Sequence, residues 1–153
     1  MDKQRLTDDL QKITEICKDG VLGYGTAAEA IKYDDLKTLF LRLSQQRKAF
    51  IEDLRNEALS LGIELNSSGS AKGFFHRTWL ATKALFSNQT NEKVIEESMF
   101  GEKAALDVYD QVLADHELPQ YLKDILKEQQ RLIKVSIQQL SSLKTEVKNV
   151  SSS

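Results

Sequence analysis

Two glutamates, Glu97 and Glu102, occur in a stretch whose small and apolar residues recur at helical spacing. The recurring positions include Val94, Gly101 and Ala105, which predicts a long helix that carries carboxylates toward its apolar seam. A carboxylate that is buried in such a seam needs a cationic partner. That partner is either a metal ion or an arginine, and the choice separates a di-metal protein from a bundle without a metal centre.

Four segments carry apolar residues at this spacing, and we expect helices at about 3–31, 34–61, 91–115 and 119–146. Gly62 offers a C-terminal stop to the second segment, and Asn91 is a candidate N-cap of the third. The links within the first and the last pair are short, so each pair predicts an antiparallel hairpin. About 30 residues join the two hairpins, enough to run the height of a bundle whose helices are ~40 Å long. The sequence therefore predicts an all-α, ferritin-like four-helix bundle, with two antiparallel hairpins joined by one long crossover.

The chain of 153 residues is expected to form a single domain over residues 1–148. Residues 149–153 are polar and lack apolar periodicity, which predicts a disordered tail.

Residues 71–86 predict a short extra helix in the crossover that carries the block His76, Arg77 and Trp79. Aromatic and basic residues share this segment, which is also typical of a helix lying on a membrane surface. We favour a helix that covers the open flank of the bundle, because a crossover in this topology must lie against the bundle.

Polar residues interrupt the apolar stripe of each predicted helix near its midpoint, which indicates one shared polar layer in the bundle centre. The predicted layer consists of Cys17, Gln46, Arg47, Glu97, Glu102, Gln129 and Ser136. Ferritin-like proteins build di-iron sites there, with Glu from two helices and Glu-x-x-His from each of the other two.

That ligand pattern is incomplete in this chain. Glu102 precedes Tyr109 by seven residues, a spacing often found in ferritin-like helices, but the same count back from Tyr24 gives Cys17. The second predicted helix has no Glu-x-x-His where the pattern needs it. In the fourth, Glu128 could be the glutamate, but Arg131 occupies the histidine position.

The only histidines, His76 and His116, lie away from the predicted layer. Hard di-metal sites need several anionic oxygens and usually imidazole. We therefore expect no cofactor and treat Glu97, Glu102 and Glu128 as remnants of a metal site, with iron or manganese as the alternative. In the favoured interpretation Arg47 takes the place of the metal and pairs with Glu102 or Glu97.

Composition excludes some classes of function. Charges of both signs nearly balance, for a net charge of −2, which argues against a nucleic-acid binder that works through a basic surface. Cys17 is the only cysteine, so no internal disulfide forms. No apolar run reaches the ~20 residues of a membrane span, and the first residues lack the apolar core of a signal peptide. We expect a cytoplasmic protein that binds neither nucleic acid nor a membrane surface.

Several blocks of the sequence resemble one known family. They are Ile16–Gly20 with Gly23, Tyr24 and 27–29; Gln46, Arg47, Phe50, Asp53 and Leu54; Gly69, Ser70, Gly73, His76, Arg77 and Trp79; and Gly101, Glu102, Ala105 and Tyr109. Over about residues 8–145 the chain resembles a bacterial ferritin-like four-helix-bundle family known only as a domain of unknown function. The resemblance implies a ferritin-like bundle and a bacterial source. It implies no activity, substrate or set of ligand residues.

These observations favour a non-enzymatic binding or assembly module, with a stress-related role as a further hypothesis. Its partner would be another protein or a second copy of the chain. One alternative is a divergent di-metal or redox-active protein that uses Glu97, Glu102, Glu128 and Cys17. A second alternative is a peripheral membrane module that acts through residues 71–86.

Overall fold

The computed structural model describes residues 2–65 and 90–151, and the secondary structure within these ranges is all helical. The four helices are α1 (Lys3–Ala30), α2 (Asp34–Ser60), α4 (Asn91–Leu113) and α5 (Gln120–Ser151). None of these helices is both long enough and apolar enough to cross a membrane. The predicted crossover helix at 71–86, with His76, Arg77 and Trp79, lies outside the described residues.

In the first hairpin, local hydrogen bonds satisfy backbone groups at the start of α1 and at the end of α2. The Asp2 side chain accepts a hydrogen bond of 2.9 Å from the Gln4 amide and so caps the start of α1. Gly62 follows α2 with a φ of 73°, in the left-handed region that glycine adopts without strain. The amides of Gly62 and Ile63 donate to the carbonyls of Leu59 and Ala58. This is a Schellman motif, and it ends α2 next to the glycine that the sequence indicates as its stop.

The second hairpin differs from the prediction at two helix ends. Thr90, rather than Asn91, caps α4, because its hydroxyl accepts a hydrogen bond of 3.1 Å from the Lys93 amide. Helix α5 continues to Ser151, past the predicted end near 146 and into the range predicted to be a disordered tail. Val147 is 4% exposed, so the apolar face of α5 still packs against the bundle in its last turns.

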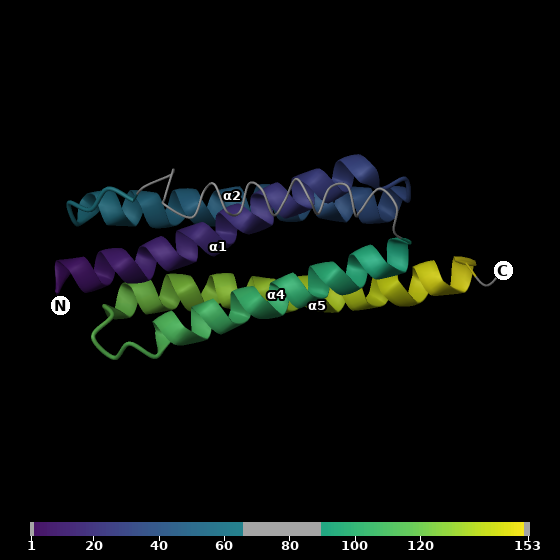
Figure 1. The fold of residues 1–153 in the computed structure, drawn as a ribbon. Helices are drawn as coiled ribbons and strands as arrows, with labels where there is room; N and C mark the ends of the chain where they lie inside the picture. Colours follow the sequence, from purple (N-terminus) through teal and green to yellow (C-terminus); the bar gives the residue numbers. More distant parts are fainter. Residues whose placement is uncertain (1, 66–89, 152–153) are drawn as a thin grey trace.

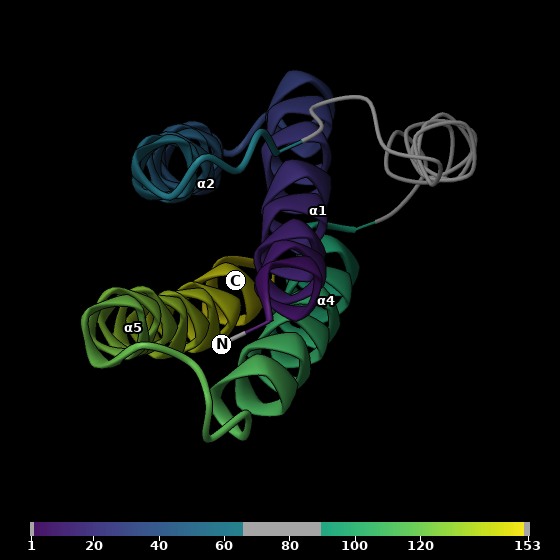
Figure 2. The same ribbon diagram turned by 90° about the vertical axis from the view of Figure 1, so that its left-hand side faces the viewer.

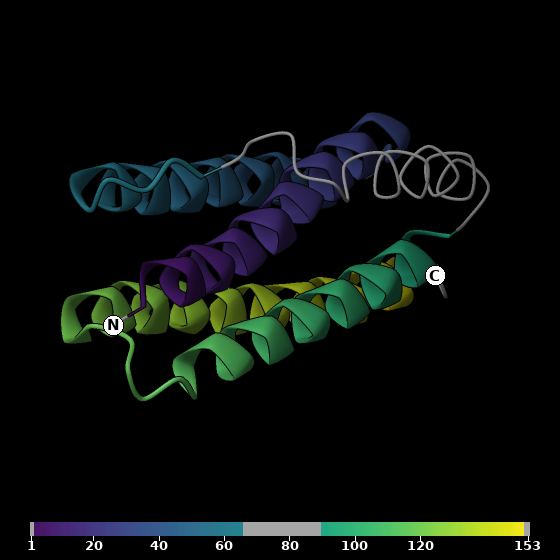
Figure 3. The same ribbon diagram turned by 60° about the vertical axis from the view of Figure 1, so that its left-hand side comes forward.

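The two hairpins lie against each other mainly through α1 and α4 (Figure 2). Within each hairpin the helices are antiparallel, as predicted from the short links (Figure 1). The end of α2 and the start of α4 lie at opposite ends of the molecule, and Figure 3 shows the same arrangement from a second direction. The chain between the hairpins therefore has to connect the two ends of the bundle.

The core consists of two apolar clusters. The first lies toward the start of α1 and includes Leu10, Ile13 and Leu54, and the second lies toward its end and includes Phe40 and Ile95. On α2 the boundary between them falls between Leu43 and Phe50, on α4 between Ile95 and Ala105, and on α5 between Ile133 and Leu140. The buried polar residues Arg47, Glu102 and Ser136 lie in these three gaps. A polar layer therefore divides the apolar core near the middle of the bundle.

Candidate functional site

The centre of the layer is an ion pair between Arg47 of α2 and Glu102 of α4. Arg47 Nη1 donates to Glu102 Oε1 over 2.7 Å, and Nη2 donates to Oε2 over 2.5 Å. The two side chains are only 2% and 3% exposed. This bidentate geometry is the strong form of a charge-assisted hydrogen bond. The structure thus selects Glu102 from the two partners that the sequence offers for Arg47.

Aromatic rings and a glycine surround the guanidinium group. The Arg47 Cζ atom lies 5.7 Å from the ring centroid of Tyr24 and 5.8 Å from that of Phe50, within the range of cation–π attraction. A Cβ atom added to Gly20 would lie 3.0 Å from Arg47 Cγ. The side chain of Arg47 therefore packs against the bare backbone of α1 at Gly20. Gln46, which is partly buried, accepts a longer hydrogen bond of 3.4 Å from Arg47 Nε.

The sequence patterns predict neither Gly20 nor Tyr24 as part of the polar layer. Gly20 appears in the sequence only among the residues that carry the family resemblance, and no pattern indicates the arginine opposite it. Tyr24 is noticed only as a spacing marker in the metal-site pattern. Both lie on the face of α1 that meets the ion pair, two turns or less from Cys17.

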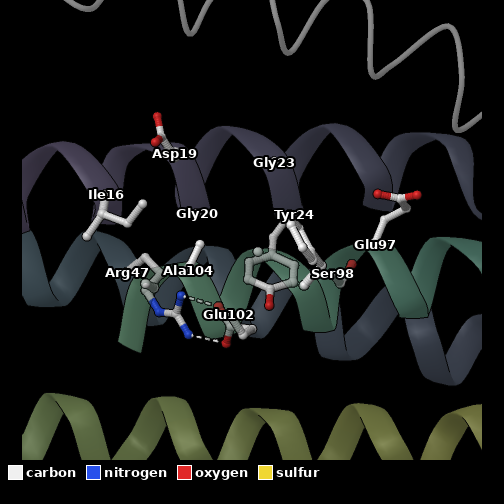
Figure 4. A pocket seen from close by; sticks show the side chains of 13 residues that line it. Ile16, Asp19, Gly20, Gly23, Tyr24, Arg47, Glu97, Ser98, Glu102 and Ala104 are labelled. Atoms are coloured by element: carbon white, nitrogen blue, oxygen red, sulfur yellow. Dashed lines mark hydrogen bonds and ion pairs between the residues drawn. The ribbon is translucent and has the colours of Figure 1, made fainter. Parts of the chain in front are cut away.

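Burial and Glu102 together set the charge state of the groups around the pair. Burial by itself lowers the pKa of Arg47, but the hydrogen bonds and the negative charge of Glu102 outweigh it and hold the pKa above its ordinary value. Burial raises the pKa of Tyr24 well above its ordinary value, and the Glu102 carboxylate acts in the same direction. The Tyr24 hydroxyl makes no hydrogen bond with a described residue, although it points to the side on which Glu102 lies (Figure 4).

A chain of hydrogen bonds runs through the layer and includes all four described helices. Tyr109 of α4 donates its hydroxyl proton to Gln129 Oε1 of α5 over 2.7 Å. Cys17 Sγ of α1 lies 3.4 Å from the same hydroxyl oxygen, and because the tyrosine proton is already used, the thiol is the donor. Gln129 Nε2 in turn donates to the Phe50 carbonyl of α2 over 3.4 Å.

This hydrogen-bonded chain is uncharged. Burial raises the pKa of Cys17 to about 11, so the thiol remains protonated near neutral pH. Burial also raises the pKa of Tyr109 well above its ordinary value, and a negative charge on Cys17 would raise it further. The ion pair is thus the charged part of a layer whose other members are neutral.

Three residues predicted for the layer or the metal remnant have other roles. Glu97 is 46% exposed and lies 3.5 Å from Lys93 on its own helix, so it is not part of the layer. Glu128 is 57% exposed and pairs with Arg131 on the surface of α5. Ser136 is buried as predicted, but its hydroxyl donates to the Leu132 carbonyl within α5 and joins no other helix.

The residues gathered at the layer do not fit a di-metal centre. They supply one carboxylate, Glu102, both of whose oxygens already accept hydrogen bonds from Arg47. Within residues 2–65 and 90–151, no three His, Cys, Asp or Glu side chains come together as a set of metal ligands. Of the two histidines, His116 lies in the exposed turn between α4 and α5 and His76 lies outside the described residues.

A pocket of about 370 Å³ opens beside the ion pair, between α1 and α4 (Figure 4). Tyr24, Arg47, Glu102 and Phe100 are among the residues that line it. Asp19 also lines it, and burial raises the pKa of Asp19 to about 7, with the charge of Glu15 adding to the effect. The volume is at the small end of the range for small-molecule sites.

Comparison with known protein families identifies one match. Residues 5–115 match the family described as Domain of unknown function (DUF2383). The chain belongs to this family. The DUF2383 match includes Cys17, Arg47, Glu102 and Tyr109 but ends before α5, so Gln129, which completes the hydrogen-bonded chain, lies beyond it. A comparison with curated proteins finds no match.

Proposed function

We propose that this protein is a non-enzymatic, ferritin-like bundle that acts by binding or assembly, with the Arg47–Glu102 pair at the position of a di-metal centre. The observation that carries the proposal is the buried, bidentate ion pair in the middle of the four helices. Ferritin-like proteins place their metal ligands in the same part of the bundle. The two antiparallel hairpins, with the end of α2 and the start of α4 at opposite ends, also support a ferritin-like topology.

The electrostatics of the pair argue against a metal at the same place. A metal ion bound to Glu102 would displace the guanidinium group and leave Arg47 buried without a partner. An unpaired buried charge costs several kcal/mol, roughly 3–5 in measured cases. The neighbouring rings of Tyr24 and Phe50 are neutral, so neither can take over the pairing of the Arg47 charge.

The neutral members of the layer support a structural rather than a reactive role. A nucleophilic or redox-active cysteine has a lowered pKa and some contact with solvent. Cys17 has a raised pKa and is 1% exposed. Its hydrogen bond to Tyr109 serves to satisfy a buried phenol oxygen, and the layer holds the four helices in a fixed arrangement.

Elemental analysis tests this proposal. The protein is purified from cells supplied with iron and manganese, and the same measurement is made on Glu102→Gln and on the surface control Glu97→Gln. We expect far less than one metal ion per chain in all three, and no rise in Tm when Fe²⁺ or Mn²⁺ is added. Stoichiometric metal that is lost in Glu102→Gln but retained in Glu97→Gln would favour the alternative, a divergent di-metal or redox-active protein.

The remaining expectations from the sequence are separate hypotheses. The peripheral membrane alternative depends on residues 71–86, and co-sedimentation with anionic liposomes at low salt tests it, since absence of binding would exclude it. The stress-related role, the cytoplasmic location and the bacterial source stay predictions from the sequence.

A further inference from the structure

A groove on the outside of the first hairpin leaves two leucines exposed. It has a volume of about 410 Å³ and lies between α1 and α2. Leu22 of α1 and Leu41 of α2 line it and are 45% and 49% exposed. Gly25 lines the same groove and lies beside Ser44 of α2.

Two lysines lie along the α2 side of this groove. Lys37, Leu41, Gln45 and Lys48 follow one another at intervals of three or four residues and so form a single stripe. Both lysines are exposed, and neither forms an ion pair with another residue of the described ranges. They are separated by about 16 Å along the helix axis. Glu29 also lines the groove but already has an interaction partner.

Helix α4 presents a stripe with the opposite charges. Glu97, Phe100, Ala104 and Asp107 lie at intervals of three or four residues, and all are exposed. Phe100 is 74% exposed, the most of any large apolar side chain in the described ranges. The two acids are separated by about 15 Å along the axis, nearly the spacing of the two lysines. Lys93 lies 3.5 Å from Glu97, but this is an exposed pair of the kind that contributes little.

We propose that the α4 stripe of one molecule docks into the α1–α2 groove of a second copy. Phe100 enters the groove between Leu22 and Leu41, and the acids Glu97 and Asp107 face Lys37 and Lys48. Burial of an exposed phenylalanine supplies the affinity, and the charges fix the register of the two helices. The inference rests on the proposed binding or assembly role and names a partner for it.

Because the stripe and the groove are different surfaces, the contact is heterologous. In a pair, one molecule keeps its groove free and the other keeps its stripe free, so further copies can add until a ring closes or a linear assembly forms. The charge contribution requires that association weakens as salt increases.

Sedimentation equilibrium of the full chain provides the first test. We expect concentration-dependent association of the native protein, and at least a tenfold rise in Kd for Phe100→Ser and for Leu41→Ser. Tyr121→Ser is the matched control, since it also removes an exposed apolar side chain, 43% exposed on α5, and should leave Kd unchanged. A native protein that stays monomeric at high concentration and low salt would overturn the proposal.

Paired charge reversals provide the second test. Lys37→Glu/Lys48→Glu reverses the groove, and Glu97→Lys/Asp107→Lys reverses the stripe. Each variant alone should be monomeric, whereas an equimolar mixture should associate, because each reversed surface then meets its complement. Lys127→Glu/Lys134→Glu on exposed positions of α5 controls for net charge and should associate like the native protein.

One result of the mixing experiment would contradict the proposal. If the two reversed variants do not associate when mixed, although circular dichroism shows both to be folded, the assignment of the two surfaces is wrong. That result would not bear on the Arg47–Glu102 layer or on the metal content of the protein. Failure of the docking proposal is therefore distinct from failure of the proposed function.

Discussion

At the scale of single residues, the site depends on how Arg47 is accommodated in an apolar bundle. Its charge is balanced by Glu102, its guanidinium carbon lies 5.7 and 5.8 Å from the ring centroids of Tyr24 and Phe50, and its alkyl chain lies against Gly20. These contacts show why an arginine can be 1% exposed without leaving an unpaired charge. They also predict which small changes the site tolerates.

Replacing Gly20 by alanine should disturb the arginine. The new methyl group would lie 3.0 Å from Arg47 Cγ, which requires the arginine or α1 to move. We expect the crowding to outweigh the gain in helix propensity of about 1 kcal/mol and to lower the free energy of unfolding by roughly 1 kcal/mol. Urea unfolding measures the change.

Gly101→Ala is the matched control for this substitution. Gly101 is also inside a helix, but a Cβ atom there would meet nothing within 4 Å. The substitution Gly101→Ala should therefore raise the free energy of unfolding by about 0.5–1 kcal/mol through helix propensity alone. Equal stabilisation by Gly20→Ala would contradict the tight packing of Arg47 against α1.

Asp19 should make stability depend on pH. Its pKa is raised to about 7 in the folded state by burial and by Glu15. Below the ordinary carboxyl pKa, Asp19 is protonated in both the folded and the unfolded state, so its burial does not lower the free energy of unfolding. As pH rises toward about 7 the unfolded state ionises first, so folding becomes less favourable and stability falls.

Asp19→Asn removes this dependence. We expect the variant to gain roughly 1–2 kcal/mol over the native protein at pH 8 and almost nothing at pH 4, a range that allows for solvent screening of a partly exposed group. Urea unfolding at the two pH values measures the difference. Asp53→Asn, at an exposed position of α2, should change the free energy of unfolding equally at the two pH values. A similar pH dependence there would remove Asp19 as the cause.

At the scale of helices, the ends are set by local hydrogen bonds, and the faces are set by packing. Gly62 ends α2 through a Schellman motif that needs a residue with positive φ, and the sequence predicts that end. The start of α4 is less clear from the sequence, because Thr90 and Asn91 are both good capping residues. The backbone geometry decides in favour of Thr90.

Thr90→Ala should therefore cost about 1 kcal/mol of unfolding free energy. The lost acceptor leaves the Lys93 amide at the first turn of α4 without its partner. Asn91→Ala should stay within ~0.5 kcal/mol of the native protein. Thermal and urea unfolding followed by circular dichroism compare the two, and a larger effect at Asn91 would place the cap one residue later.

At the scale of the whole molecule, the polar layer joins the two hairpins. Outside the α1–α4 contact, the Arg47–Glu102 pair links α2 to α4, and the Gln129 hydrogen bond links α5 to α2. The layer also separates two apolar clusters, each of which contains residues from both hairpins. The ion pair therefore contributes to how the hairpins are placed against each other.

A double-mutant cycle measures this coupling. Arg47→Met and Glu102→Met should each cost about 3–5 kcal/mol, because each leaves one buried charge unpaired. The double variant should cost clearly less than the sum, since it leaves no charge. The control cycle uses Arg131→Met and Glu128→Met, an exposed bidentate pair, and should give a coupling below about 1 kcal/mol. Equal coupling in the two cycles would contradict a buried pair.

The sequence alone identifies the four helices and the need for a cation beside a buried carboxylate. Apolar periodicity is a local property of each helix, so it can be read without knowing the fold. The same reasoning predicts Arg47 as the cation, because the ligand pattern for a metal is incomplete. It also predicts the antiparallel hairpins, since short links allow no other arrangement.

Only the tertiary structure decides which polar residues reach the centre. Glu97 and Glu102 are five residues apart and therefore point about 140° apart around α4, so one helix cannot bury both against the same neighbours. Glu128 and Gln129 differ by one residue, about 100° of rotation, and only Gln129 faces Tyr109. Periodicity gives the spacing of a stripe but not its angle toward the other helices. That angle is fixed by packing, and it makes Arg47, Glu102 and Gly20 one site.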